Sequence, residues 1–161
     1  MSQKITPNLW FDTEAEEAAA FYVSVLPNSR ITAVTHYPDA VPQKAGAVLT
    51  VEFVLDGQRF LAINGGPEFT FDEAVSFMIE CETQDEIDHY WDALTSGGGQ
   101  EGPCGWLKDR FGLSWQVAPT GMAEMFADAD PSRASRAMQA MFTMKKLDIA
   151  ALERAADGAP V

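Results

Sequence analysis

Apolar and polar positions follow two different spacings along the chain, and the order of these spacings occurs twice. Residues 5–12 and 74–82 are strand-like apolar runs, and residues 14–26 and 84–95 carry apolar side chains at helical spacing. Alternation along a short run predicts a strand, whereas apolar positions three and four residues apart predict an amphipathic helix. The chain therefore has the pattern of a duplicated strand–helix unit.

The same helix-start motif, Thr-x-x-Glu, opens both helical segments. It occupies residues 13–16 and 83–86, 70 positions apart, and each helix then carries an aromatic pair, Phe21-Tyr22 and Tyr90-Trp91. In this capping box the Thr hydroxyl accepts from the backbone N–H three residues on, and the Glu carboxylate reaches back to the Thr N–H. A repeat of this length is too long for a solenoid unit and indicates two half-domains that form a site between them.

A hairpin signal follows in the first half. Two apolar runs, 48–55 and 58–64, flank Asp56-Gly57. Asp-Gly between apolar runs favours a two-residue turn because both residues tolerate positive φ. Such a turn pairs Glu52 with Leu61. Together with the strand that follows the helix, the first half is predicted to run strand, helix, strand, strand, strand.

The second half repeats this order in shorter form and ends in a tail. Strand candidates at 104–108 and 114–118 flank a turn at 109–112. In the tail, Asp130 stands directly before a proline, and Asp148 precedes another apolar stripe, so both aspartates are expected to cap helices. A helical tail needs a surface to cover, which is either its own sheet or a second subunit.

Composition narrows the class of protein. A chain of 161 residues, 47% of them hydrophobic, suffices for one globular domain with a sizeable core. The net charge of −13 argues against a nucleic-acid partner, because phosphate binding relies on clustered Lys and Arg. We find no apolar run long enough for a membrane span and no export signal, and the two cysteines, Cys81 and Cys104, suit a reducing compartment. We expect a cytoplasmic protein without membrane association.

Several segments together resemble a known superfamily. They are Leu9-Trp10-Phe11, Phe21-Tyr22, Leu49 to Phe53, Leu61 to Gly66, Cys104-Gly105-Trp106 and Ser114-Trp115-Gln116. The chain resembles the vicinal oxygen chelate superfamily of glyoxalases, bleomycin-resistance proteins and dioxygenases, and within it the PhnB-like, or 3-demethylubiquinone-9 3-methyltransferase-like, subgroup. The resemblance implies an α+β fold of two tandem βαβββ modules with a C-terminal helical extension. It also implies a homodimer with these helices at or near the interface.

The implied domain layout follows from the same resemblance. A paired βαβββ domain would span 1–121, with modules at about 1–70 and 71–121, and the extension at 122–161 would pack on this domain or on the dimer partner.

The resemblance also implies positions for metal ligands, which this chain fills with weak donors. The matching positions are near Pro7 or Asn8, between Phe60 and Asn64 where only Asn64 offers an oxygen, at Ser76 and at Gln116. Neutral amide and hydroxyl oxygens bind transition metals poorly. His36 and His89 lie elsewhere in the pattern. We therefore expect no metal and no other cofactor.

The strands of the two modules supply the candidate binding residues. If the halves enclose a cavity, its inward side chains would be Asn8, Trp10, Asn64, Ser76, Met78, Trp106 and Gln116. Aromatic walls with a few amide and hydroxyl groups are typical of a small-molecule pocket. A register shift of one residue would move each of these side chains to the other face.

The candidates for acid–base chemistry are Glu52 and Gln116, with Glu80 a further strand carboxylate. A carboxylate buried in an apolar site has its pKa raised toward neutrality. Glu80 is expected on a solvated face, and both readings stay open for Glu52.

Three functions follow from these observations. The first is a metal-free protein that binds a small molecule between its modules. The alternatives are a metal-dependent lyase, isomerase or dioxygenase with atypical ligands, and a purely structural or interaction module. Methyltransferase activity is implied only by the family label. The Gly-rich segments 64–67 and 97–99 do not join a strand to a helix in the manner of nucleotide-binding turns, so we expect no S-adenosylmethionine site. Whether the chain catalyses a reaction stays open.

Overall fold

The computed structural model describes residues 4–159 and divides into two compact units. The first unit is Met1–Phe71 and the second is Asp72–Val161. We describe each unit by itself. Within the described residues, every helix is too short or too polar to cross a bilayer.

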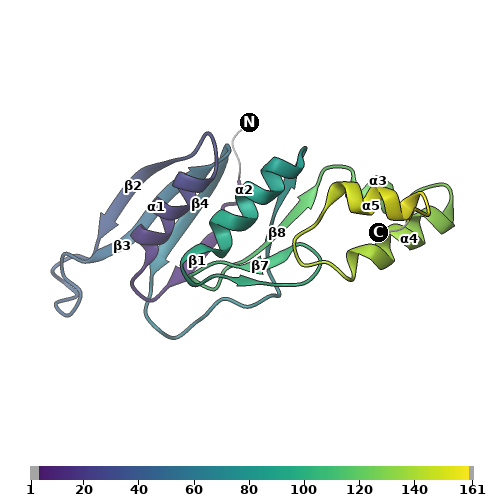
Figure 1. The fold of residues 1–161 in the computed structure, drawn as a ribbon. Coiled ribbons are helices and arrows are strands. Elements are labelled where there is room, and N and C mark those ends of the chain that lie inside the picture. Colours follow the sequence, from purple (N-terminus) through teal and green to yellow (C-terminus); the bar gives the residue numbers. More distant parts are fainter. Residues whose placement is uncertain (1–3, 160–161) are drawn as a thin grey trace. The chain divides into compact units, whose positions relative to one another are not determined.

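The first unit is a four-stranded sheet with one helix. Its elements are β1 (Asn8–Phe11), α1 (Ala15–Val25), β2 (Arg30–His36), β3 (Val48–Leu55) and β4 (Gln58–Asn64). The strand order is β1-β4-β3-β2, with β1 parallel to β4 and the other pairs antiparallel (Figure 1). The hairpin prediction is confirmed, because Glu52 pairs with Leu61 and Leu55 with Gln58.

The second unit repeats this topology and adds the helical tail. Its module consists of β5 (Phe77–Cys81), α2 (Gln84–Thr95), a short 3₁₀ turn η1 (Ser96–Gly98), β6 (Gln100–Glu101), β7 (Trp106–Lys108) and β8 (Ser114–Pro119). The strand order β5-β8-β7-β6 matches the first sheet strand for strand. The prediction of two tandem βαβββ modules with a helical extension is therefore confirmed.

Three strands begin later than predicted. The run at 5–12 enters β1 only at Asn8. The run at 74–82 enters β5 only at Phe77, because the Asp72 carboxylate accepts the N–H of Ala74 at 2.9 Å and holds a turn there. The run at 104–108 enters β7 only at Trp106, because Cys104 and Gly105 have φ of 57° and 81°. Positive φ lies outside the strand region of backbone conformations.

The core of the first unit lies between α1 and its sheet. The helix buries Ala18, Tyr22 and Val25, and the Tyr22 ring lies 6.3 Å from Phe53, which in turn stacks on Phe60 at 5.4 Å. Buried residues alternate along β3 and β4, so one face of the sheet carries the apolar side chains that meet the helix.

In the second unit, α2 buries Ile87, Trp91 and Leu94, and the buried alternate residues of the sheet are Leu107, Trp115 and Val117. The Trp115 position matches that of Phe60 in the first sheet, because each lies four residues before the end of its parallel strand pair, at Pro119 and at Asn64. The two modules thus build their cores by the same alternation.

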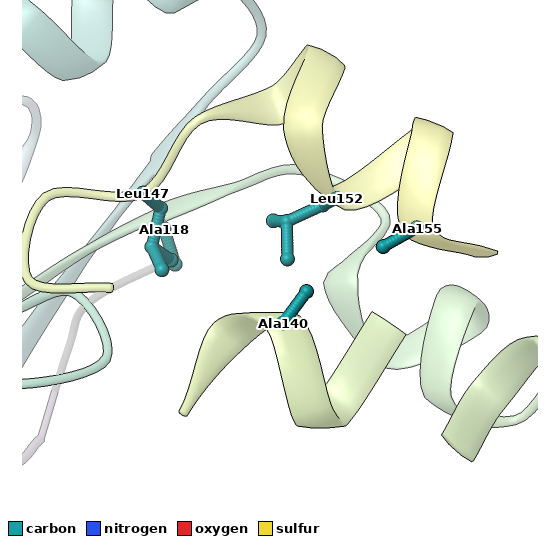
Figure 2. Close-up of a cluster of buried hydrophobic side chains, with 5 residues drawn as sticks. All are labelled: Ala118, Ala140, Leu147, Leu152 and Ala155. Carbon is teal, nitrogen blue, oxygen red and sulfur yellow. The ribbon is translucent and has the colours of Figure 1, made fainter. Parts of the chain in front are cut away.

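The C-terminal tail packs on the second module. It forms α3 (Met122–Phe126), which the sequence pattern did not predict, α4 (Pro131–Met141) and α5 (Ile149–Ala156). A buried cluster joins the helices to the sheet through Ala118, Ala140, Leu147, Leu152 and Ala155 (Figure 2). Asp130 and Asp148 cap α4 and α5 as predicted, since their side chains accept the N–H groups of Ser132 and Ala151.

Polar contacts also tie the tail to the module. The N–H groups of Cys104 and Gly105 donate to the carbonyl oxygens of Met144 and Lys145 at 2.8 and 2.7 Å. On α2, the Gln84 side chain donates to the carbonyl oxygen of Leu147 at 3.0 Å and accepts the N–H of Ile149 at 3.0 Å. This segment of the tail therefore continues the hydrogen bonding of the second module.

The two predicted capping boxes have different outcomes. At α2, the Thr83 hydroxyl accepts the N–H of Glu86 at 3.2 Å, as expected, while the Glu86 carboxylate takes the N–H of Glu82 rather than that of Thr83. At α1 the box prediction is wrong. The N-cap is Glu14, whose side chain makes no capping bond, and Thr13 donates its backbone N–H to the Glu14 carboxylate.

Candidate functional site

Four of the predicted binding residues come together on the second sheet. In register, Gln116 of β8 pairs with Met78 of β5 on one side and with Trp106 of β7 on the other. Paired residues project to the same face of a sheet, so these three side chains are neighbours on the face opposite Leu107 and Trp115. Ser76 directly precedes β5, and its hydroxyl accepts the Gln116 amide N–H at 2.9 Å.

A cavity of about 500 Å³ has Trp106 in its lining, whereas Ser76, Met78 and Gln116 lie outside that lining. The β6–β7 connection forms much of it, where Gly102 and Trp106 close a tight turn through an N–H to carbonyl bond of 2.8 Å. The lining residues are Glu73, Gln100, Glu101, Gly102, Pro103, Cys104, Trp106, Leu107, Lys108 and Ser114. Apolar and aromatic walls with a few polar groups make this cavity suitable for an organic molecule.

Two carboxylates at the cavity are held in the ionised form. The Lys108 ammonium donates to Glu73 over 2.5 Å and lowers the pKa of Glu73 below its usual value. Glu101 accepts the indole N–H of Trp91 at 3.1 Å and faces Lys145 at 3.4 Å, and these bonds lower its pKa, that from Trp91 most. Both groups are therefore anionic at neutral pH.

The two cysteines have different surroundings. Cys81 is fully buried, and burial, followed by the nearby charge of Glu86, raises the pKa of its thiol to about 11. A thiol with such a pKa stays protonated and behaves as a small apolar side chain. Cys104 is half-buried and lines the cavity with its backbone in the left-handed region.

In the first unit, Asn8 and Trp10 lie on the same face of the sheet. They pair with Leu61 and Ile63 of β4. Asn8 is exposed and donates to the carbonyl oxygen of Thr6, whereas the Trp10 indole donates to the carbonyl oxygen of Gly66 at 2.8 Å and meets Phe69 edge-on. Trp10 is thus fixed by contacts inside the first unit.

Asn64 lies on the opposite face, so the expectation that it points inward with Asn8 and Trp10 is wrong. It pairs with Phe11, and its side chain is 7% exposed. Its amide oxygen accepts the N–H of Ala15 at 2.8 Å, and its amide nitrogen donates to the carbonyl oxygen of Val48 at 3.1 Å. Because side chains alternate, the register error of one residue exchanged the two faces of β4.

Comparison of the two sheets locates the true counterpart of Gln116. Phe11 pairs with Asn64 at the end of the first parallel pair, and Cys81 pairs with Pro119 at the end of the second. Gln116 lies three residues before Pro119, and Leu61 lies three residues before Asn64, so Gln116 corresponds to Leu61. The predicted ligand position in the first module is therefore occupied by a side chain without a donor atom.

The residues present do not fit a transition metal. Asn64 is committed to two structural hydrogen bonds, and Ser76 and Gln116 are bonded to each other. Within the described part of the chain, no three His, Cys, Asp or Glu side chains gather closely enough to hold a metal ion. Amide and hydroxyl oxygens are poor ligands for zinc, iron or nickel.

The candidate acid–base residues lie on open faces. Glu52 is in the row of Leu61, about half exposed, with its carboxylate 3.9 Å from the Arg59 guanidinium. Glu80 is exposed on β5. A charge pair in this setting is solvated, so Glu52 does not lie in a buried apolar site.

The sequence pattern missed a second cavity, of about 400 Å³, in the first unit. Tyr37 and Lys44 are part of its lining; the Tyr37 hydroxyl donates to the carbonyl oxygen of Asn64 at 2.6 Å, and the Lys44 ammonium lies 5.1 Å from the Tyr37 ring centroid. It also missed Glu73 and Lys108 of the larger cavity. Their pairing depends on the turn before β5, which no strand or helix signal marks.

Comparisons with known proteins agree with this architecture. The profile of the family described as 3-demethylubiquinone-9 3-methyltransferase matches residues 3–118. A PhnB protein from Bacillus cereus is 36% identical, with a TM-score of 0.65 over 73% of this chain and 100% of that one. No curated protein matches the chain.

Two more distant structures share the fold. Protein PA1353 from Pseudomonas aeruginosa is 21% identical, with a TM-score of 0.61 over 73% of this chain and 98% of that one. The fosfomycin resistance protein FosX from Listeria monocytogenes, whose structure contains Mn(II) and sulfate, is 13% identical, with a TM-score of 0.52 over 74% and 92%. From the profile match and the Bacillus cereus relative, this chain belongs to the 3-demethylubiquinone-9 3-methyltransferase family, the PhnB-like group of the vicinal oxygen chelate superfamily.

Proposed function

We propose that this PhnB-like protein binds a small organic molecule in the cavity beside Trp106, without a transition metal. The observation that carries the proposal is that Trp106, one of the predicted binding residues, lines this cavity and also stands in the outward row with Met78 and Gln116, which lie outside the lining. A concave site of about 500 Å³ that combines apolar surface, including the Trp106 ring, with charged and polar side chains has the size and character of a small-molecule pocket.

The metal-dependent alternative has weaker support. The FosX structure shows that the fold can hold Mn(II), but at 13% identity this likeness concerns the fold alone. In this chain the position that corresponds to Gln116 is Leu61, and the Gln116 amide already donates to Ser76. We therefore propose binding rather than metal-assisted catalysis.

The methyltransferase activity in the family description is not part of the proposal. The segment at 97–99 follows α2 and leads into β6, and the segment at 64–67 ends β4 and leads into a turn. Nucleotide-type cofactors are usually held where a Gly-rich turn joins a strand to a helix N-terminus. Neither segment has this arrangement.

A ligand screen by nuclear magnetic resonance tests the proposed site. Hits from a library of neutral and charged metabolites are expected to shift the backbone resonances of the residues that line the cavity. Trp106→Ala is expected to lower the affinity of these hits at least about tenfold, since an aromatic contact is lost. Phe142→Ala, a change of an exposed side chain on the tail, serves as the control. Hits that map elsewhere, or that bind Trp106→Ala equally well, would overturn the proposal.

A metal titration tests the second half of the proposal. Protein purified without chelator or affinity tag is expected to contain no stoichiometric Mn, Fe, Ni, Zn or Cu by elemental analysis, and added divalent ions are expected to leave its melting temperature unchanged. One tightly bound ion per chain, lost in Gln116→Leu, would show that the site takes a metal.

A further inference from the structure

Trp106 differs from the other tryptophans in what its indole N–H contacts. Trp10 donates to a backbone carbonyl at 2.8 Å, Trp91 donates to Glu101 at 3.1 Å and Trp115 donates to Asp109 at 2.9 Å. Trp106 has no such acceptor within residues 4–159, and it lines the larger cavity. No buried side-chain nitrogen in the described residues lacks a partner, so this N–H is open rather than sealed in the core.

An indole nitrogen can only donate a hydrogen bond. A molecule that sits in the cavity and covers the Trp106 N–H removes water from it, and an unpaired donor left behind would cost the desolvation of that group. A bound molecule with an oxygen acceptor avoids this cost. The cavity thus favours a ligand that presents a carbonyl or similar oxygen to Trp106.

The charges of the cavity disfavour an anionic ligand. The charged side chains of its lining are Glu73, Glu101 and Lys108, and the single ammonium is already bonded to Glu73. An anion would face two carboxylates, and it would have to share the Lys108 ammonium with Glu73 and the nearby Lys145 ammonium with Glu101. The chain as a whole carries a net charge of −13, which adds repulsion at a distance.

The walls favour a flat apolar body. Trp106 and Pro103 offer aromatic and aliphatic surface to the cavity. Flat rings bury a large apolar area against an indole at a small cost in conformational entropy. From these contacts we infer that the cavity takes a neutral aromatic molecule bearing a ketone or amide oxygen, and that this oxygen accepts the Trp106 indole N–H; the inference rests on the proposed binding function.

Three probes of similar size separate these requirements: acetophenone, ethylbenzene and benzoate. The first has a neutral acceptor, the second has none, and the third is anionic. Each is titrated into the full chain and followed in ¹H–¹⁵N spectra, where the Trp106 indole signal is identified by its absence in Trp106→Phe. This substitution keeps an aromatic ring but removes the donor together with part of the ring surface, so the preference between two probes, rather than either affinity alone, reports the lost hydrogen bond.

Acetophenone is expected to move the Trp106 indole proton downfield, and ethylbenzene is expected to bind without doing so. The preference for acetophenone over ethylbenzene is expected to fall about 3- to 10-fold in Trp106→Phe, the range of a single net hydrogen bond. Benzoate is expected to bind at least about tenfold more weakly than acetophenone. Phe142→Leu, which lies outside the lining, is expected to leave all three affinities unchanged.

The outcomes distinguish the inference from the function on which it rests. If none of the three probes shifts a resonance of the cavity lining, the proposed binding site is itself overturned. If the probes bind there but Trp106→Phe keeps the same preference, or benzoate equals acetophenone, only the inference fails. Should Trp106→Phe not fold, the Trp106 indole signal is assigned instead from its nuclear Overhauser contacts in the native protein and its downfield shift decides alone; equal shifts with acetophenone and ethylbenzene would contradict the inference.

Discussion

The starts of α1 and α2 occupy the same step of the repeated topology, yet they are held in different ways. The N-terminus of α2 is capped locally by Thr83, which accepts the N–H of Glu86. The N-terminus of α1 is capped from a distance by Asn64 at the end of β4, which accepts the N–H of Ala15. In the second module the place of Asn64 is taken by Pro119, whose ring can neither donate nor accept. A module without this distant cap depends on its own sequence for one.

The reason lies in the length of one connection. From the end of β1 to the start of α1 there are three residues, 12–14, and from β5 to α2 there are two, 82–83. The two threonines stand equally far from their strands, but the extra residue moves Thr13 out of the N-cap position. The aromatic pairs show the same difference of one residue, because Phe21 and Tyr90 are 69 positions apart whereas the two threonines are 70 apart.

The largest effect is expected for Asn64→Ala. The change leaves the N–H of Ala15 and the carbonyl of Val48 without their partner in a buried place, which should cost about 2–4 kcal/mol of unfolding free energy in the first unit. Urea unfolding, read by hydrogen exchange of the α1 amides, measures it. Asn8→Ala makes the same change at an exposed position of β1 and should cost less than about 0.5 kcal/mol. Equal losses in the two variants would refute the distant cap.

A smaller effect is expected for Gln84→Ala at the first position of α2. Its counterpart Ala15 receives a cap, whereas the Gln84 side chain donates to the carbonyl oxygen of Leu147 and accepts the N–H of Ile149 in the tail. Their loss should cost about 1–2 kcal/mol and increase proteolysis of the tail. Gln139→Ala, on the exposed side of α4, is the control. Unchanged exchange at the Ile149 amide would show that Gln84 does not hold the tail.

Thr83→Ala is expected to cost about 1 kcal/mol, the usual value for loss of a hydroxyl cap. The Glu86 N–H would lose its acceptor, and exchange at that amide should accelerate more than at Trp91 in the middle of the helix. Thr83→Ser keeps the hydroxyl and should restore most of the stability. If Ala and Ser variants unfold at the same urea concentration, the cap contributes nothing measurable.

Acidification should loosen the tail of the second unit by a lesser amount. Hydrogen bonds from Lys146 and then Gln84 lower the pKa of Asp88, so the stability that this carboxylate contributes is present above the pKa of the unfolded chain and is lost as pH falls through the lower folded value. Between about pH 5 and pH 3, hydrogen exchange of α5 should rise in the native protein and less so in Asp88→Asn. The opposite trend, tighter packing at low pH, would contradict this assignment.

Local signals in the sequence predicted local structure well. Asp56-Gly57 fixed the hairpin register, and Asp130 and Asp148 cap their helices as expected. The parallel pairing of β1 with β4 is set by packing across α1 rather than by neighbouring residues, so the face of Asn64 could not be read from the chain. The cavity could not be predicted for the same reason. It depends on positive φ at Cys104 and on the pair of Glu73 with Lys108, which only the folded backbone brings together.

Thr13→Ala is expected to have the smallest effect and gives the strictest test of the comparison, because it alters the same motif residue as Thr83→Ala. The Thr13 contact at the start of α1 uses its backbone N–H, which donates to Glu14, and alanine keeps this group. The unfolding free energy should change by less than about 0.5 kcal/mol, as for other exposed substitutions. A loss near that of Thr83→Ala would mean that Thr13 caps α1 in solution. Asn64 and Thr13 would then cap the same helix end. The losses of unfolding free energy in Asn64→Ala and Thr13→Ala would add to more than the loss in the double variant.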